Sequence, residues 1–441
     1  MRAEKYRYDG EGLKNPRTKT EQDCPYDCGI CPQHKSHTCL AIIDVTNRCN
    51  LKCPVCFANA AAAGYVYEPT KQQIKSMLEN LRQNEPVPAT ALQFSGGEPT
   101  LREDLFDLIR MAKEVGFRHV EVNTNGIRLA QSVEYCRGLH EAGMSTVYLQ
   151  FDGLTPEVYK FTRGADLLET KMRALENCRK AGLTSIVLVV TLIKGVNDLQ
   201  LGNIIKFATK NIDIIRCVNV QPISLCGRLP QAEREKMRIT IPDFMKLCEE
   251  QTEGRIKASD FYPVPAVVPV SKAVGALRNK RYVEFTAHPH CGMATYIFVE
   301  NGEIIPITHY GNVEKFLKGM QAVYETASKG HTKRAKLRMA ATLRHIKFSL
   351  LRKYIWPILK DGSYKALGDL HRKMIMISSM HFMDPYNFDL ERAQRCCIHY
   401  AVPDGRIIPF CTMNSIHRPQ IEKQLSIPIS EWKKQQIEIA A

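Results

Sequence analysis

Short apolar runs alternate with amphipathic stretches from residue 41 to residue 225 of the chain. The runs are rich in β-branched side chains, as buried strands are, and in the stretches between them apolar residues recur at helical spacing. We predict strands at 41–47, 91–95, 119–123, 146–151, 185–193 and 214–222. We predict helices at 70–84, 101–115, 132–142, 166–181 and 199–210.

Six strand–helix steps with short connections indicate a parallel sheet that is covered by helices. Because the alternation stops near residue 225, a partial barrel of six strands is favoured over a closed barrel of eight. A flat, doubly wound sheet would show the same periodicity, so the pattern alone leaves these two architectures open. The predicted fold class is α/β.

The alternation of strands and helices is absent on both sides of this region, which predicts that the chain is organised in three parts. Residues 1–40 form a polar, basic arm and a loop rich in cysteine, residues 41–225 form the strand–helix core, and residues 226–441 form a mixed C-terminal region.

A basic segment from Thr326 to Lys360 contains ten lysines and arginines and no acidic residue. Its apolar residues recur at helical spacing and its basic residues fall largely elsewhere on the wheel, which predicts one basic amphipathic helix. Such a helix either packs on the barrel with a solvated basic face or docks on an anionic membrane surface. The apolar positions are Met339, Leu343, Ile346, Leu350 and Tyr354, and the basic ones are Lys333, Lys336, Arg344 and Lys347.

The composition limits the class of protein. With 441 residues, 44% of them hydrophobic, the chain can build a full core, and it lacks the run of about eighteen apolar residues that spans a membrane. The first residues lack the apolar core of a signal peptide, so we expect a cytoplasmic protein, with peripheral contact to the membrane surface as an option. A formal net charge of +15 points to an anionic partner such as nucleic acid, a phosphorylated small molecule or a lipid surface.

Eleven of the sixteen cysteines fall in three groups, which in a reducing compartment favours metal binding over disulfide bonds. The second group, Cys49, Cys53 and Cys56, has the spacing C-x3-C-x2-C on the loop after the first predicted strand. Three thiolates this close can hold three irons of a [4Fe–4S] cluster and leave the fourth iron free to bind a small molecule. A structural zinc site, or a cluster with a distant fourth cysteine, would use the same residues.

This triplet, together with Gly96-Gly97-Glu98-Pro99 after the next strand, resembles the radical S-adenosylmethionine (SAM) superfamily over residues 41–225. The resemblance implies a partial (β/α)6 TIM-like barrel in which the three cysteines hold a [4Fe–4S] cluster whose open iron binds SAM. It also implies that the glycine motif meets the SAM amino group, since two glycines allow the backbone to approach closely. Polar residues at other strand ends could hold the SAM ribose, or could be plain turn and cap residues: Asn123, Gln150, Asp152 and Asn197.

The first cysteine group lies just before the first predicted strand. Four thiolates within sixteen residues favour an auxiliary [4Fe–4S] cluster that passes electrons to the radical site. His34 and His37 would allow a zinc site there instead. The four cysteines are Cys24, Cys28, Cys31 and Cys39.

The third cysteine group comes from distant parts of the chain. Cys291, Cys411 and one of the adjacent pair Cys396 and Cys397 are credible ligands of a second auxiliary cluster, and Cys226 is a candidate for the fourth. Buried thiols without a metal are the alternative. Four scattered cysteines fit small apolar core positions: Cys136, Cys178, Cys217 and Cys248.

Four motifs together narrow the resemblance to the archaeal tetraether lipid synthase family, which overlaps with proteins described as dihydropterin C-methyltransferases. In this family Cys396, judged by its distance from His399, is the matching member of the adjacent pair. The motifs extend over about residues 24–415 and are Cys24-Pro-Tyr-Asp-Cys28-Gly, Thr46-Asn-Arg-Cys49-Asn-Leu, His288-Pro-His-Cys291 and Pro403-Asp-Gly-Arg-Ile-Ile-Pro-Phe-Cys411.

The resemblance implies an iron–sulfur enzyme that reduces SAM to methionine and a 5′-deoxyadenosyl radical, which abstracts hydrogen from an unactivated C–H bond. That step needs no acid or base, so we nominate no catalytic side chain. The expected reaction is C–C bond formation on a lipid chain, with radical C-methylation of a reduced pterin as the alternative.

The expected partners are this small-molecule substrate and an electron donor such as ferredoxin or flavodoxin; nucleic acid is not expected. Two alternatives remain for the basic surface: a non-catalytic metal- and nucleic-acid-binding protein, and a radical enzyme acting on RNA.

Overall fold

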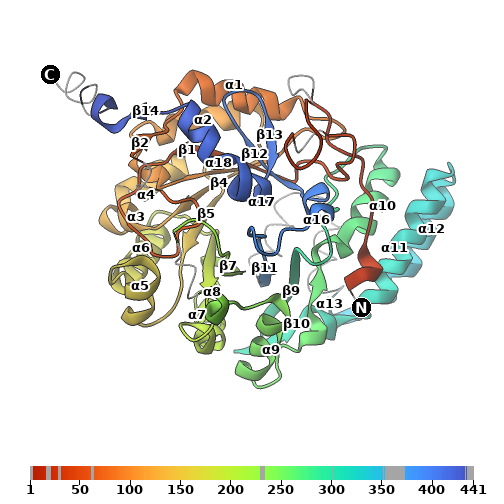
Figure 1. Cartoon of the computed structure of the whole chain (residues 1–441). Coiled ribbons are helices and arrows are strands. Elements are labelled where there is room, and N and C mark those ends of the chain that lie inside the picture. Colours follow the sequence, from red (N-terminus) through yellow and green to blue (C-terminus); the bar gives the residue numbers. More distant parts are fainter. Residues whose placement is uncertain are drawn as a thin grey trace.

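The structure is a computed structural model of the chain, shown from N- to C-terminus in Figure 1. It describes residues 3–15, 21–27, 31–60, 64–228, 234–300, 302–350, 352, 373–432 and 434.

Six parallel strands form the centre of the fold. They are β1 (Leu40–Thr46), β3 (Ala91–Gly96), β4 (His119–Thr124), β5 (Thr146–Gln150), β6 (Ile186–Leu192) and β7 (Ile215–Pro222). Each pairs in parallel with the next in this order. The predicted α/β fold with a partial barrel is therefore confirmed, and its six predicted strands lie within a few residues of the observed ones.

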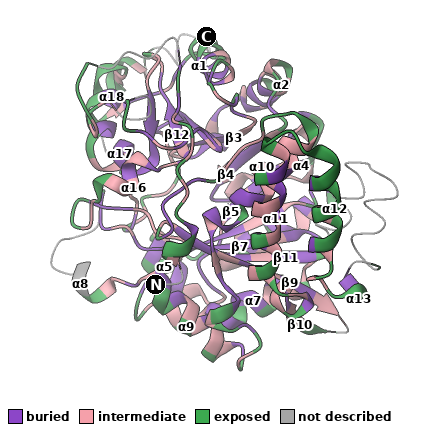
Figure 2. Ribbon diagram, turned by 90° about the vertical axis from the view of Figure 1, so that its right-hand side faces the viewer, coloured by how far each residue is buried: buried purple, intermediate pink, exposed green. Residues whose placement is uncertain are grey.

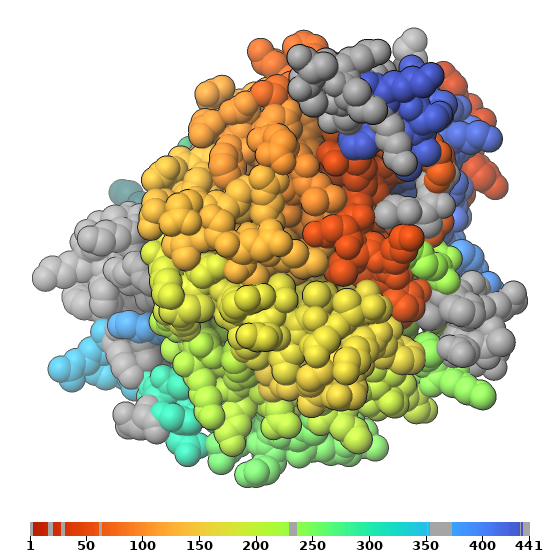
Figure 3. All heavy atoms as spheres, turned by 90° about the vertical axis from the view of Figure 1, so that its left-hand side faces the viewer, coloured from red at the N-terminus to blue at the C-terminus, as the bar shows by residue number. Residues whose placement is uncertain are grey.

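Helices connect these strands and cover their outer face, which Figure 3 shows as one continuous surface. Thr70 caps the first helix by accepting a hydrogen bond from the Gln73 amide, and Gly116 ends the second in the left-handed conformation. The helix α5 was not predicted. The helices are α1 (Lys71–Arg82), α2 (Leu105–Val115), α3 (Ile127–Gln131), α4 (Val133–Glu141), α5 (Pro156–Arg163), α6 (Leu168–Lys180) and α7 (Leu201–Lys210).

Strands from the C-terminal region extend this sheet on both sides. β11 (Met374–Met380) pairs in parallel with β7, and β12 (Ile398–Ala401) pairs in parallel with β1. Eight parallel strands thus lie side by side in the described chain, two more than predicted, because β11 and β12 come from sequence without strand–helix alternation. Antiparallel strands continue both edges, and one pair stands apart: β8 (Tyr262–Pro263), β9 (Gly292–Glu300), β10 (Glu303–Pro306), β13 (Ile407–Pro409), and the pair β2 (Tyr65–Val66) and β14 (Ile427–Pro428).

The two faces of the sheet differ in chemistry, because side chains alternate between them along each strand. On the outer face, Val218 and Val220 of β7 join the apolar core with Ile204 of α7. On the inner face, Asn219 and Gln221 of the same strand bond to the Tyr148 hydroxyl. Figure 2 shows the buried strands enclosed by helices whose outward sides are exposed. A polar inner face is therefore available for a site.

The predicted basic amphipathic helix is wrong as a single element. The chain forms α11 (Val313–Ser328), α12 (Thr332–Leu343) and the short α13 (Phe348–Leu350). Between the last two, Lys347 donates its amide to the Tyr310 carbonyl, and Ile346 pairs with Gly311, so the backbone bonds to a neighbouring segment instead of continuing the helix. Tyr354 lies outside the described residues.

Short helices follow two barrel strands, η2 (Pro99–Leu101) after β3 and η3 (Asp198–Gln200) after β6. The other helices of the described chain are η1 (Ala3–Tyr6), α8 (Arg234–Met237), α9 (Ile241–Gln251), η5 (Ala258–Asp260), η6 (Val264–Val267), α10 (Val268–Arg278), η7 (Ile307–Tyr310), α16 (Leu390–Gln394), α17 (Phe410–Thr412), η9 (Met413–His417) and α18 (Arg418–Gln424). None of the described helices combines the length and apolar character needed to cross a membrane.

Candidate active site

A cavity of about 190 Å³ opens at the carboxyl ends of the parallel strands, where a barrel of this kind places its chemistry. Cys49, Cys53 and Cys56 line it from the loop that follows β1. Residues at the ends of the next strands complete the lining, among them Ser95, Gly96, Gly97, Glu98, Asn123, Tyr148, Gln150, Thr191 and Gln221. The structure therefore brings the three cysteines and most of the predicted SAM contacts into one cavity.

The cysteine loop offers its sulfurs to a metal. The Leu51 amide donates to Cys49 Sγ at 3.4 Å, a kind of contact that also stabilises sulfur ligands of iron. Burial raises the pKa of Cys49 to about 12, so its thiol would stay protonated at neutral pH unless a cation were bound. Three thiols around one cavity, with an N–H directed at a sulfur, fit an iron–sulfur cluster held by these residues.

The glycine motif holds the cysteine loop in place. A Cβ on Gly97 would lie 2.2 Å from the Arg48 carbonyl oxygen, and one on Gly96 would lie 2.1 Å from that of Thr46. The Gly97 amide donates to Thr46 at 2.7 Å, and the Glu98 amide donates to Arg48 at 2.8 Å. The two glycines therefore let the loop after β3 pack against the backbone that leads into Cys49.

Glu98 ties two loops together. It is buried, and its carboxylate accepts from the amides of Thr100 and Asn125 and from the hydroxyls of Thr100 and Thr124. Burial raises the pKa of Glu98, and these hydrogen bonds oppose that shift. Pro99 begins η2 and does not line the cavity. These two residues shape the loop that bears the glycines.

Arg163 is a site residue that the sequence analysis missed. It lines the cavity and hydrogen-bonds to Cys53, and its guanidinium binds both carboxylate oxygens of Asp152, at 2.6 and 2.9 Å. Burial alone would lower the pKa of Arg163, but Asp152 and Cys53 raise it. Arg163 is the last residue of α5. The sequence marks this helix by Pro156 in its first turn and by Gly164 at its C-cap.

Two of the predicted SAM contacts stand behind the cavity. Asp152 is fully buried and engaged by Arg163, while Asn197 donates to the carbonyls of Asp152 and Thr191 and accepts from the Ile193 amide. They act as turn and support residues, which was the alternative for each. Asn123 and Gln150 do line the cavity.

A buried lysine supports the same wall. Lys171 donates to the Asn125 carbonyl and, at 2.8 Å, to the Gln150 side-chain oxygen. Burial, with a contribution from Arg163, lowers the pKa of Lys171 to about 7. The lysine thus fixes Gln150 at the cavity edge.

The third cysteine group is brought together by the fold. Cys291 precedes β9, Cys396 precedes β12 and Cys411 lies in α17, and their thiols raise one another's pKa. The Met383 amide donates to Cys411 Sγ at 3.3 Å. Cys397, by contrast, hydrogen-bonds to Cys39. Of the adjacent pair, Cys396 is the member that lies within electrostatic range of both Cys291 and Cys411, whereas Cys397 lies within range of Cys291 and bonds to Cys39.

The candidate for a fourth ligand lies elsewhere. Cys226 contacts the Ser224 hydroxyl at 3.3 Å and lies within electrostatic range of Cys56, on the side of the cavity. The described residues thus place three cysteines, without Cys226, in the third group.

Two aromatic residues connect the cavity with the third group along the chain. Phe382 and Phe410 line the cavity, with ring centroids 4.1 Å apart. Each directly precedes a residue of the third group's surroundings, because the Met383 amide donates to Cys411 Sγ.

The first cysteine group is only partly described. Cys24 hydrogen-bonds to Cys31, Cys28 lies outside the described residues, and Cys39 is not with them, because it lies beside Cys397 and donates to the Glu284 carbonyl at 3.3 Å. The spacing predicted that Cys39 would join Cys24, Cys28 and Cys31 in one four-thiolate site. In the structure Cys39 lies away from Cys24 and Cys31, so it is not part of such a site.

The histidines of this loop are engaged elsewhere. His34 Nε2 lies 3.0 Å from the Cys396 carbonyl and 3.1 Å from His399 Nε2, and His37 Nε2 accepts from the Glu284 amide. Among the described residues, the one set of three histidine, cysteine or acidic ligand atoms within 4.8 Å of one another is Glu4, His288 and His290. The zinc alternative for the first group gains no support from this part of the chain.

Comparison with known proteins identifies the class. The model of the radical SAM superfamily matches residues 43–208, the barrel strands and the cysteine loop. The FeFe-hydrogenase maturase HydG resembles the fold with a TM-score of 0.41, at 15% identity over 49% of this chain and 50% of its own. The protein is a radical SAM enzyme, which removes the alternative of a non-catalytic metalloprotein.

Sequence relatives define the family. The chain is 49% identical over 444 residues to the 7,8-dihydro-6-hydroxymethylpterin dimethyltransferase of Methanocaldococcus jannaschii, covering 98% of this chain and 87% of that protein. It is 32% identical to the GTP 3′,8-cyclase of Limosilactobacillus fermentum over 50% of this chain and 63% of the relative. The chain belongs to the family of the dimethyltransferase.

Proposed function

We propose that this enzyme carries out radical C-methylation of a reduced pterin. The sequence relationship to a pterin dimethyltransferase favours this substrate class over the lipid chain expected from the sequence. A [4Fe–4S] cluster on Cys49, Cys53 and Cys56, with SAM bound, would supply a 5′-deoxyadenosyl radical that abstracts hydrogen from a C–H bond. The chain's own residues would then hold the substrate, orient it and keep other reactants away.

The observation that supports a pterin most directly is the hydroxyl of Tyr148 in the cavity wall. It accepts hydrogen bonds from the side-chain amides of Asn219 and Gln221, the latter at 3.0 Å. Burial raises the pKa of Tyr148, so the hydroxyl keeps its proton at neutral pH. With its acceptor positions filled, the hydroxyl has a hydrogen to donate to a ligand such as a ring carbonyl.

Other polar groups on this wall suit a flat heterocycle with donors and acceptors on its edge. Asn123 donates to the Ser95 hydroxyl at 3.3 Å, and the Gln93 amide donates to buried Glu121 at 2.8 Å. Ser95, Gln93 and Asn123 all line the cavity. The side-chain oxygens of Asn123 and Gln93 can accept further hydrogen bonds, which the ring N–H groups of a pterin can donate and a hydrocarbon chain cannot.

A second candidate substrate, a long-chain lipid, is favoured by a different observation. An apolar cavity of about 500 Å³ lies between β9, β11 and α11, with Met374 and Met376 in its wall. These side chains share one face of β11 with Met380, which lines the cysteine cavity about 13 Å further along the strand. A chain in this second cavity would point along that face toward the cysteines.

Contact with a membrane belongs to this second candidate. The side chains of Arg344 and Lys347 are exposed, as are the apolar side chains of Leu337 and Phe348. An anionic lipid surface would attract the basic pair, and the apolar pair could enter its headgroup layer. Replacing both basic residues by glutamine should then weaken binding to anionic vesicles, whereas unchanged binding would remove this contact.

Two matched variants distinguish the substrates. Anaerobic protein is incubated with dithionite and SAM, with either 7,8-dihydro-6-hydroxymethylpterin or a long-chain ether lipid, and deoxyadenosine and products are measured. If the substrate is a pterin, Tyr148→Phe should slow its conversion about tenfold or more by removing one hydrogen bond at the site, while Met376→Trp, which fills the apolar cavity, should not. The reverse pattern, with product only from the lipid, would replace the pterin proposal by the second candidate.

A further inference from the structure

Arg392 is a half-buried cation whose side chain faces a sulfur. Its Nε donates to Cys291 Sγ at 3.5 Å, and one terminal nitrogen donates to the His381 carbonyl at 2.6 Å. Arg392 belongs to α16, four residues before Cys396. The guanidinium thus reaches from the helix that precedes one cysteine of the third group to another cysteine of that group.

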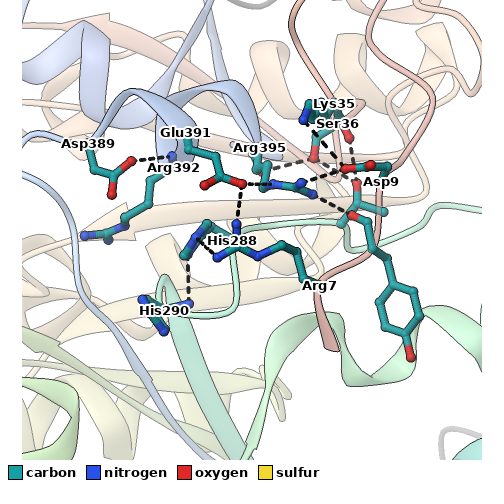
Figure 4. A network of polar contacts seen from close by, with 12 residues as sticks. Arg7, Asp9, Lys35, Ser36, His288, His290, Asp389, Glu391, Arg392 and Arg395 are labelled. Atoms are coloured by element: carbon teal, nitrogen blue, oxygen red, sulfur yellow. Dashed lines mark hydrogen bonds and ion pairs between the residues drawn. The ribbon is translucent and has the colours of Figure 1, made fainter. Parts of the chain in front are cut away.

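The carboxylates around Arg392 are used by other partners. Glu391 pairs with Arg7 at 2.5 Å and with Arg395 at 3.2 Å, and Asp389 accepts from the backbone amide of Arg392 instead of its side chain. Figure 4 shows the Arg392 side chain turned away from this network. Among the ion pairs of the described residues, none includes Arg392.

The same network holds α16 rigidly. Arg395 donates to the Tyr8 carbonyl at 2.9 Å and pairs with Asp9 at 2.6 Å, so the N-terminal segment clamps the helix (Figure 4). Lys35 and Ser36 bond to the backbone of Gln394 and Arg395 at the helix end. Arg392 therefore starts from a fixed backbone, and its position beside Cys291 is part of the fold.

A guanidinium removed from water without an anion is costly, because its charge loses solvation and gains no partner. Burial alone would lower the pKa of Arg392, and three nearby groups raise it: the thiols of Cys291 and Cys411 and the Asp389 carboxylate, which bonds to the Arg392 backbone amide. Of these, only the Cys291 sulfur accepts a hydrogen bond from the guanidinium. In return Arg392 opposes the rise that burial causes in the pKa of Cys291. The arrangement is balanced when the cysteines carry negative charge, as they do when they bind an iron–sulfur cluster.

We propose that Arg392 is a positioning residue that sets the reduction potential of an auxiliary cluster bound by Cys291, Cys396 and Cys411. This rests on the iron–sulfur chemistry of the proposed function. One-electron reduction by an external donor, such as a ferredoxin or a flavodoxin, adds one negative charge to the cluster while the donor loses one electron. A cation hydrogen-bonded to a ligand sulfur stabilises that added charge, so Arg392 raises the potential and eases reduction.

The test is a redox titration of anaerobically reconstituted full-length protein, followed by electron paramagnetic resonance. Cys396→Ser identifies the signal of the third group by its loss. Arg392→Met should shift the midpoint of that signal to a more negative potential, Arg392→Lys should shift it less, and the signals of other clusters should stay in place. Arg179→Met, which removes an equal charge paired with Asp213 on the outer surface, should shift none.

An Arg392→Met signal at the wild-type midpoint, or an equal shift of all signals, would overturn the inference. If the Arg392→Met protein lacks the third cluster, its iron content falls, and Arg392→Lys then tests the inference. A cluster retained in Arg392→Lys supports the role of charge, and a cluster lost there overturns it. Deoxyadenosine release by the wild-type protein is measured on the same samples. Its absence would count against the proposed function and would leave the midpoint comparison intact.

Discussion

The two cysteine sites of this enzyme are built in opposite ways. Cys49, Cys53 and Cys56 come from one loop of eight residues, so their proximity is almost guaranteed by the chain itself. Cys291 and Cys396 are more than 100 residues apart and meet because β9, β11 and β12 join the central sheet. The geometry of the first site therefore depends on one loop, and the geometry of the second depends on the folding of the whole sheet.

The sites differ in charge compensation as well. Arg163 beside Cys53 shares its charge with the carboxylate of Asp152, whereas Arg392 beside Cys291 has no carboxylate partner among the described ion pairs. A cluster at the loop site would thus sit beside a guanidinium paired with a carboxylate. One at the third group would sit beside a guanidinium that bonds to the cluster ligand, while the nearby Asp389 carboxylate bonds to the backbone amide. This difference would favour electron storage at the third group and strongly reducing chemistry at the loop.

The largest expected effect comes from breaking the loop site. Cys53→Ala removes one of the three thiols proposed to hold the SAM-binding cluster, so deoxyadenosine release should fall at least about 1,000-fold, as for loss of an essential catalytic group. Iron bound elsewhere should remain. Liquid chromatography of the products and an iron assay test both points, and a variant that still cleaves SAM would place the radical site at another cysteine group.

The next effect separates two neighbouring cysteines. Cys396→Ser should lower the iron content by up to about four atoms per chain, the complement of one cubane cluster, whereas Cys397→Ser should not, because Cys397 faces Cys39. Iron assay and visible absorption of the two reconstituted variants give the comparison. Equal iron loss in both would mean that the adjacent pair shares the metal.

A smaller effect tests how the loop site is held. Gly97→Ala puts a Cβ 2.2 Å from the Arg48 carbonyl, so the cysteine loop must move, and we expect a loss of about 3 kcal/mol in the free energy of unfolding. Urea unfolding measures it. Gly195→Asn is the control, because Gly195 is left-handed with open space around it and asparagine tolerates that conformation. Similar losses in both variants would contradict the packing role of Gly97.

The smallest effect concerns Lys171, the buried cation behind the loop site. Its pKa is lowered to about 7 in the fold, so between pH 7 and its ordinary value the unfolded chain binds more protons and stability rises with pH. Lys171→Met removes this contribution. The difference in unfolding free energy between wild type and variant should change by about 1 kcal/mol from pH 8 to pH 9. A pH-independent difference would mean that Lys171 stays charged in the fold.

The sequence predicted the six barrel strands well, because the alternation of apolar strands and helices is a short-range pattern. The spacing of Cys49, Cys53 and Cys56 placed these residues together, and the structure finds all three at one cavity. The cluster on them stays a prediction. The buried character expected for Cys136, Cys178, Cys217 and Cys248 is confirmed.

What the sequence missed depends on contacts between distant segments. Cys39 was grouped with Cys24 by spacing, but backbone pairing of the 31–39 segment with residues before β12 carries it to Cys397. Arg163 was missed because α5 is short. The prediction of a single basic helix was wrong because the backbone near Ile346 bonds to residues 310–312 instead of continuing the helix. The helical spacing of apolar residues carries no information about such long-range backbone hydrogen bonds.

The pairing of β11 with β7 and of β12 with β1 has a practical consequence. A fragment that ends near residue 225 would contain every strand of the barrel core, yet it would leave the amide and carbonyl groups of two long parallel strands without partners. Exposed edges of this kind recruit other chains, so such a fragment should precipitate rather than serve as a minimal catalyst.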